Sequence, residues 1–144
     1  MNFEKIKSLL EKKILILDGP MGTMIQKRKL TEKDFRGKKF NNFKNNLQGN
    51  NDILNLSNEK IIYEIHSEFL DAGADIIETN TFNSTKISQA DYGCEDFSYE
   101  LNFEGGRIAR RAADDSMAKS NEMKFVAGVV GPTNRTCSMS PDVN

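Results

Sequence analysis

Short aliphatic runs alternate with longer segments of helical periodicity along this chain. Ile14–Leu17, Asp75–Thr79 and Phe125–Val130 have the length and the apolar character of strands. Residues 60–72 and 96–119, which separate them, carry apolar side chains at helical spacing. The order strand, helix, strand, helix, strand predicts parallel βαβ units with right-handed crossovers.

The first of the two long helices has the clearest boundaries. Ser57 is a suitable N-cap residue, and Gly73 is a suitable C′ residue after the last turn. Its buried stripe is expected to consist of Ile61, Ile62, Ile65, Phe69 and Leu70.

Shorter helices are expected over residues 2–12, 23–30 and 84–92, with Met24 and Ile25 of the second facing inward. Residues 31–58 are mostly polar and predict a long loop.

Each predicted strand ends in a polar or glycine-rich segment. In parallel α/β folds these carboxyl ends lie on one face, where ligands bind. We therefore expect Asp18, Thr79, Asn80, Thr133 and Asn134 to lie near one another. Gly19 and Gly22 would let the backbone approach a ligand or adopt positive φ. The alternative is a plain turn, because Asp-Gly after a strand is also a common turn signal.

Length and composition narrow the class of protein. A chain of 144 residues suits one domain but is short for a (β/α)8 barrel, which needs roughly 250 residues. Residues 140–144 show no closing element, so we expect the front part of a larger domain. The net charge of −1 gives no sign of a nucleic acid or membrane partner. No secretory signal or paired-cysteine motif is present, so a reduced cytoplasm is expected.

Other chemically reactive side chains have plainer interpretations. His66 is expected at a helix surface, and Cys94 and Cys137 as incidental thiols. Glu78 could form an acid/base pair with Asp18, but the sequence leaves its direction open. Glu32, Asp34 and Arg36 are expected in a solvated loop, with the alternative that Arg36 clamps a loop near the barrel mouth. Gly105 and Gly106 inside the last helix should each cost about 1 kcal/mol relative to alanine.

Several motifs carry a resemblance to a known family. Asp18–Thr23, Glu78–Phe82 and Val126–Thr136 resemble the homocysteine-binding domain of the cobalamin-dependent methionine synthases. The likeness runs from about Leu10 to Asn144. Four further stretches are similar as well: Asp34–Gly37, Gly49–Asp52, Ser88–Gly93 and Ser140–Asn144. The first motif alone would fit any homocysteine S-methyltransferase, including enzymes that use betaine or S-methylmethionine.

The resemblance implies an α/β fold, the front part of a (β/α)8 TIM barrel with about three parallel strands and connecting helices. Residues 1–144 would be an incomplete homocysteine-binding domain, truncated at its C-terminal side. In the family, zinc held by three cysteine thiolates activates the homocysteine sulfur. Methylcobalamin on another domain donates the methyl group, and methyltetrahydrofolate on a further domain regenerates it.

The resemblance also assigns roles to residues of this chain. Asp18 would hold the substrate amino group, within a substrate-binding set of Asp18, Gly19, Met21, Gly22, Thr79, Asn80 and Asn134. The zinc cysteines are expected beyond Asn144, so no catalytic or metal residue and no bound cofactor is expected here. The chain alone would be inactive. The alternatives are an enzyme with a different methyl donor and a non-functional truncated product.

Overall fold

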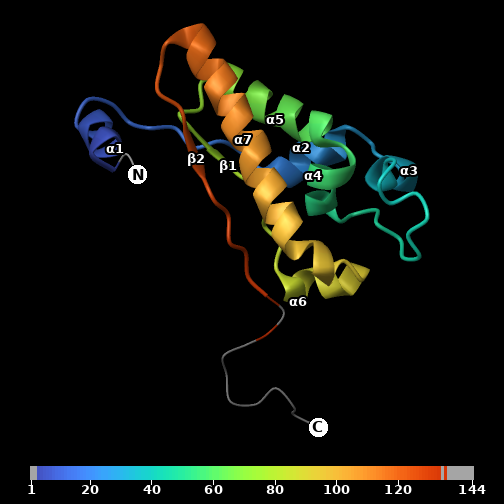
Figure 1. Ribbon diagram of the computed structural model, residues 1–144. Coiled ribbons are helices and arrows are strands. Elements are labelled where there is room, and N and C mark those ends of the chain that lie inside the picture. Colours follow the sequence, from blue (N-terminus) through green and yellow to red (C-terminus); the bar gives the residue numbers. More distant parts are fainter. Residues whose placement is uncertain (1–2, 134, 136–144) are drawn as a thin grey trace.

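A small parallel sheet lies at the centre of the fold. The computed structural model describes residues 3–133 and 135. Strands β1 (Ile76–Glu78) and β2 (Phe125–Ala127) pair in parallel, with Ile77 opposite Val126. On the other side of β1, Leu17 forms a parallel bridge with Ile76. The predicted parallel arrangement in chain order is therefore confirmed (Figure 1).

The first predicted strand is much shorter than expected, and its burial was predicted wrongly. Only Leu17 has bridge geometry, and Ile14, Ile16 and Leu17 are 88%, 56% and 49% exposed. The physical reason is position, because the two long helices contact β1 and β2 while this segment lies beyond β1 at the edge of the sheet.

The long helices α5 (Glu59–Asp71) and α7 (Ser98–Ser120) lie side by side and both contact β1 (Figure 1). Ile62, Ile65 and Leu70 of α5 are buried, as the periodicity predicted. Gly73 follows the helix with φ +106°, and its amide donates to the Leu70 carbonyl. The next amide, of Ala74, reaches back to the Phe69 carbonyl, which completes a Schellman motif and confirms the predicted helix end.

The predicted start of α5 is wrong by one residue. Ser57 is the last residue of α4 (Leu54–Ser57), and Asn58 is the residue that precedes α5. Ser57 has helical backbone within α4, where its hydroxyl donates to the Ile53 carbonyl at 3.2 Å, whereas an N-cap residue has non-helical backbone.

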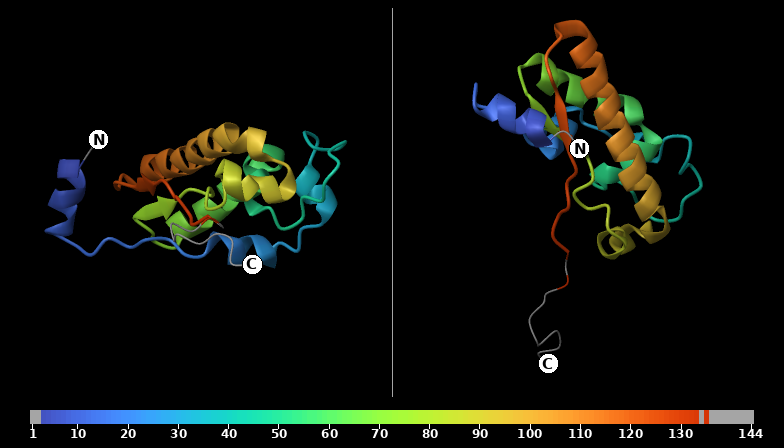
Figure 2. Two further views of the ribbon diagram at one scale, coloured as in Figure 1. Left: turned by 90° about the horizontal axis from the view of Figure 1, so that it is seen from below. Right: turned by 60° about the vertical axis from the view of Figure 1, so that its left-hand side comes forward.

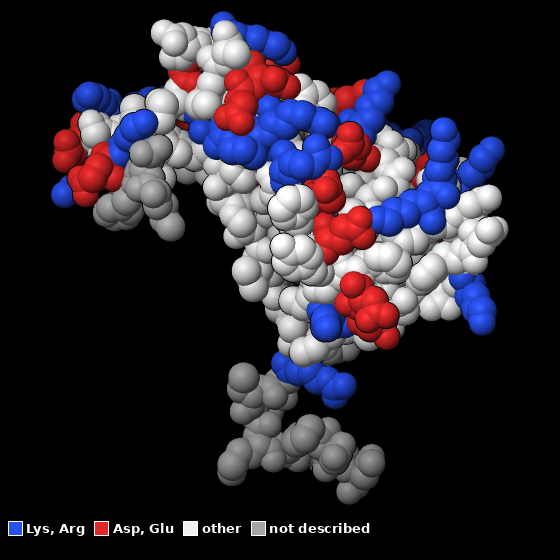
Figure 3. All heavy atoms as spheres, viewed as in Figure 1, with Lys and Arg blue, Asp and Glu red and all other residues white. Residues whose placement is uncertain are grey.

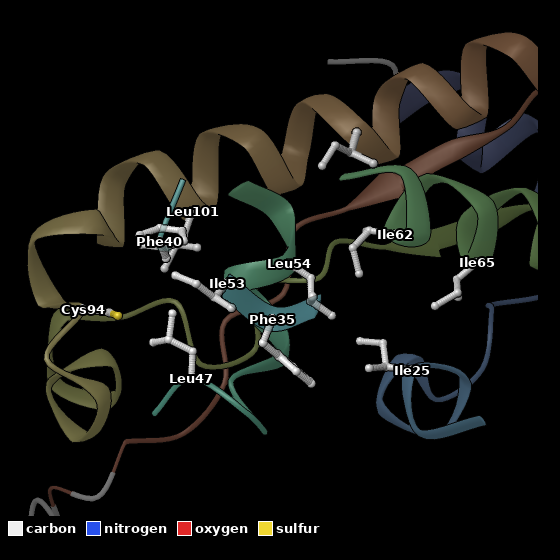
Figure 4. Packing of buried hydrophobic residues seen from close by; sticks show 11 residues of the cluster. Ile25, Phe35, Phe40, Leu47, Ile53, Leu54, Ile62, Ile65, Cys94 and Leu101 are labelled. Carbon is white, nitrogen blue, oxygen red and sulfur yellow. The ribbon is translucent and has the colours of Figure 1, made fainter. Parts of the chain in front are cut away.

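The predicted long loop is also wrong, because residues 31–58 hold three helical segments and much of the core. These are α3 (Glu32–Arg36), η1 (Asn51–Ile53) and α4. Five apolar side chains of residues 31–58 are buried in one cluster with Ile25, Ile62, Ile65 and Leu101 (Figure 4): Phe35, Phe40, Leu47, Ile53 and Leu54.

Charged side chains make this polar segment compact. Asp34 accepts from the amide of Thr31 at 2.8 Å, in a capping box that starts α3. Glu32 accepts from the amides of Leu47 and Gln48. Arg36 donates to the carbonyls of Phe40, Phe43 and Asn45. The solvated-loop interpretation of Glu32, Asp34 and Arg36 is thus corrected, since they bind loop backbone.

The remaining helices are short. They are α1 (Phe3–Leu10), α2 (Met21–Lys27), α6 (Lys86–Gln89), η2 (Ala90–Tyr92) and η3 (Glu95–Phe97). Helix α1 stands apart from the rest, at the end of an extended segment (Figure 2). No helix of the described residues is long and apolar enough to cross a membrane.

Asp75 fastens this extended segment to the start of the sheet. Its carboxylate, 3% exposed, accepts from Lys13 Nζ at 2.6 Å and from the amide of Ile16 at 3.1 Å. Burial alone would raise the pKa of Asp75, but the bonds from Lys13 and Ile16 outweigh it and hold the pKa below its ordinary value. The ionised side chain therefore stabilises the junction.

Candidate functional site

The carboxyl edge of the sheet opens into a cavity of about 560 Å³. Six of the predicted site residues line it: Asp18, Gly19, Met21, Gly22, Thr79 and Asn80. Thr133 does not line it, and Asn134 lies outside the described residues. The topology explains this convergence, because Asp18 and Thr79 follow neighbouring parallel segments at the same edge.

Asp18 places a carboxylate in the wall of this cavity. Its Oδ2 accepts from the Glu78 amide at 3.0 Å, whereas its Oδ1 is buried without a hydrogen-bond partner among the described residues. Burial raises the pKa of Asp18 to about 6, and the Glu78 amide opposes that rise. The side chain is therefore mainly ionised at pH 7 and suited to a cationic donor.

Of the two glycines in the cavity wall, Gly19 has a packing role that the sequence did not show, and Gly22 has none. A Cβ at Gly19 would lie 2.9 Å from the Phe69 ring, so a larger residue there would force this side chain of α5 to shift. A Cβ at Gly22 would only touch Asn51 at 3.5 Å. Neither glycine is among those with positive φ, so that part of the expectation is wrong.

Thr79 and Asn80 are engaged in internal hydrogen bonds. Thr79 Oγ1 accepts from the Val129 amide at 3.0 Å. Asn80, 5% exposed, donates from Nδ2 to the Asn51 carbonyl and to Asn55 Oδ1, at 2.9 and 3.1 Å. These two side chains shape the cavity and join β1 to its neighbours.

The cavity also contains residues outside the predicted set, notably Asp52, Phe82 and Asn83. Asp52 is 2% exposed and follows the polar run Gly49–Asn51, which was interpreted as part of a loop. Glu78 lines the cavity as well. Its backbone amide is the group that Asp18 contacts.

His66 is buried, so its predicted surface position is wrong. It is 0% exposed, and neither ring nitrogen has a partner among the described residues. Burial lowers the pKa of His66 to about 4. Its position on the buried side of α5, one turn after Ile62, was the signal available in the sequence.

The thiols provide no metal centre in the described part of the chain. Cys94 is fully buried, and burial raises the pKa of its thiol to about 11. Cys137 lies outside the described residues. Across residues 3–133 and 135, no three His, Cys, Asp or Glu side chains come together as a metal site, so these residues do not fit a catalytic zinc.

Comparison of the sequence with known protein families identifies the family of this chain. The pattern of the family described as Homocysteine S-methyltransferase matches residues 15–144. The chain belongs to this family.

Solved structures agree with this assignment. The metallated form of the homocysteine methyltransferase MmuM from Escherichia coli shares 26% sequence identity, with a TM-score of 0.68 over 88% of the chain. The oxidized form shares 27%, with a TM-score of 0.69 over 88% of the chain. The apo form shares 26%, with a TM-score of 0.61 over 90% of the chain.

The chain spans only 40–41% of the length of these homologues. The predicted fold class, the front part of a TIM barrel, is confirmed by this match.

Proposed function

We propose that this chain forms part of the homocysteine site of a homocysteine S-methyltransferase, with Asp18 holding the substrate α-ammonium group. The observation that carries the proposal is the carboxylate of Asp18, which lines the cavity at the strand ends and has one oxygen, Oδ1, without a hydrogen-bond partner among the described residues. A charge-assisted hydrogen bond at such a position contributes about 1.5–3 kcal/mol.

The rest of the cavity supports a small zwitterionic ligand. Its volume of about 560 Å³ lies within the range of small-molecule sites. Glu78 adds a carboxylate near Asp18, which favours a cation, while Phe82 and Met21 offer apolar surface to an aliphatic side chain. Gly19, Gly22, Thr79 and Asn80 would shape this wall, and Asn134 is proposed from the sequence alone.

Activation of the sulfur is assigned to groups outside the described residues. In the enzymes that the sequence resembles, zinc lowers the pKa of the homocysteine thiol. Since the described side chains do not form a zinc site, they are proposed to bind and orient the amino acid end only.

The proposed methyl donor is methylcobalamin, regenerated by methyltetrahydrofolate on further domains. The support is the spread of the resemblance over Glu78–Phe82 and Val126–Thr136 as well as the first motif. Betaine and S-methylmethionine remain the alternatives. Methionine formation by the intact protein that carries this chain, assayed with each donor in turn, separates them, and activity with none favours a non-functional product.

Substitution of Asp18 tests the binding proposal. Asp18→Asn keeps the shape and removes the charge, so homocysteine should bind the intact protein about tenfold more weakly or worse, since 1.4 kcal/mol is a factor of ten. Wild-type affinity should also fall as the pH drops through about 6, where Asp18 takes up a proton. Calorimetric titration measures both, and an unchanged affinity in the variant would reduce Asp18 to a turn residue.

A further inference from the structure

Asp52 is a buried carboxylate in the cavity wall that the proposed substrate contact leaves unused. It lies in η1, 2% exposed, on the same cavity as Asp18. Its Oδ2 accepts from the Asn83 amide at 2.7 Å and from Ser84 Oγ at 2.8 Å. In the described part of the chain, no lysine or arginine forms an ion pair with it.

The two donors belong to the loop that follows β1. Within this loop, residues 80–85, Phe82 and Asn83 line the cavity directly. Helix α7 also holds the loop, because Ser98 Oγ and Asn102 Nδ2 donate to the Ser84 carbonyl at 2.6 and 2.8 Å. Asp52 and α7 thus both hold the loop, and both do so at Ser84.

A buried carboxylate is a costly means of holding a loop. Burial raises the pKa of Asp52 to about 6, and the two donors only partly offset that. An ionised acceptor forms shorter and stronger bonds to N–H and O–H groups than a neutral one does. The stronger bonds fix Asn83 and, through it, the neighbouring Phe82.

We propose that Asp52 is a positioning residue that holds loop 80–85 so that Phe82 and Asn83 close one side of the homocysteine cavity. This inference rests on the proposed function for the identity of the ligand. The contact between Asp52 and the loop is itself independent of any ligand.

Two variants of Asp52 in the intact protein test the inference. Asp52→Ala removes both hydrogen bonds, whereas Asp52→Asn keeps an acceptor oxygen at the same place. In Asp52→Ala, the Asn83 amide should exchange its hydrogen at least tenfold faster, while the Ile77 amide in β1 stays protected. The Kd for L-homocysteine should rise at least fivefold. Because a neutral amide oxygen forms weaker bonds than a carboxylate, Asp52→Asn should give an Asn83 exchange rate and a Kd that lie between those of wild type and those of Asp52→Ala.

The outcomes separate positioning from other roles. Unchanged Asn83 exchange in Asp52→Ala would overturn the proposal, and so would an Asp52→Asn protein with normal exchange and weak binding, because the charge itself would then contact the ligand. If Asp52→Ala fails to fold, Ser84→Ala, which removes one of the two donors, should give an intermediate acceleration at Asn83, and no acceleration would overturn the proposal.

A wild-type protein that does not bind homocysteine would refute the proposed function instead. The exchange comparison would still decide whether Asp52 holds the loop.

Discussion

Asp18 and His66 are two ionisable side chains whose pKa values shift for the same reason, the removal of water. The pKa of the carboxyl rises to about 6 and that of the imidazole falls to about 4, because burial disfavours the charged form of each. Asp18 faces a cavity where a cationic ligand can compensate, whereas neither His66 nitrogen has a partner among the described residues. The raised pKa of Asp18 suits the binding of a cation, whereas the lowered pKa of His66 affects only the stability of the fold.

His66 should make the fold sensitive to acid. Its folded pKa of about 4 lies below the unfolded value near 6.5, so the neutral ring stabilises the fold above pH 6.5. That contribution is lost as the pH falls from 6.5 towards 4, by about 2–3 kcal/mol. Chemical denaturation of wild type and His66→Leu at a series of pH values measures it.

The informative quantity is the difference in unfolding free energy between the two proteins, since carboxylates titrate in both. This difference should shift in favour of His66→Leu as the pH falls. A difference that stays constant from pH 7 to pH 4 would contradict the buried, unpartnered state of His66.

At the scale of elements, the strand order and the site edge were predictable because they depend on short local signals. Aliphatic runs followed by polar residues placed Asp18, Thr79 and Asn80 at one edge, and the structure agrees. The core of residues 31–58 was not predictable from periodicity. Phe35, Phe40 and Leu47 are spaced five and seven residues apart, and side chain to backbone hydrogen bonds, rather than a regular helix, bring them together.

The two adjacent glycines of α7 also show what the sequence alone could not predict. Both were expected to weaken the helix, but a Cβ at Gly105 would lie 2.6 Å from Thr81 Cγ2 and 2.8 Å from Asn55 Nδ2. Gly106 has nothing within 4 Å of such a Cβ. Gly105 is therefore required where α7 closely approaches the segments that bear Asn55 and Thr81. Gly106 is not required for this approach.

Alanine substitution at these two positions forms a matched pair. Gly106→Ala should raise the unfolding free energy by about 0.5–1 kcal/mol, because alanine favours the helix. Gly105→Ala should lower it by about 1–3 kcal/mol through overpacking. Urea denaturation of both variants measures the change, and equal effects of the same sign would refute the packing described at Gly105.

At the scale of the whole molecule, the open edge of the sheet, rather than the distribution of charge, offers a surface for association. Acidic and basic side chains are interspersed over the face shown in Figure 3, with ion pairs such as Arg110–Asp114 along α7. In contrast, Ile14, Ile16 and Leu17 expose apolar surface beside an unpaired backbone edge. Such an edge is prone to pair with another chain.

The 144-residue chain should therefore self-associate through this edge. Ile14→Lys together with Ile16→Lys should reduce the associated fraction, because charges on an edge strand oppose pairing. Sedimentation velocity at several concentrations measures it, with Ile87→Lys, a partly exposed position in α6, as the control. Equal association of the edge variant and wild type would show that another surface is responsible.

The central claim is that Asp18 binds the α-ammonium group of homocysteine, and a double-mutant cycle tests it most directly. Calorimetry at pH 7.5 would compare L-homocysteine with 4-mercaptobutanoate, which lacks only the amino group, on wild type and Asp18→Asn of the intact protein. The account predicts a loss of about tenfold or more in homocysteine affinity in the variant, and nearly equal affinities of the two proteins for 4-mercaptobutanoate. Equal losses for both ligands would contradict it, since Asp18 would then act without contacting the amino group.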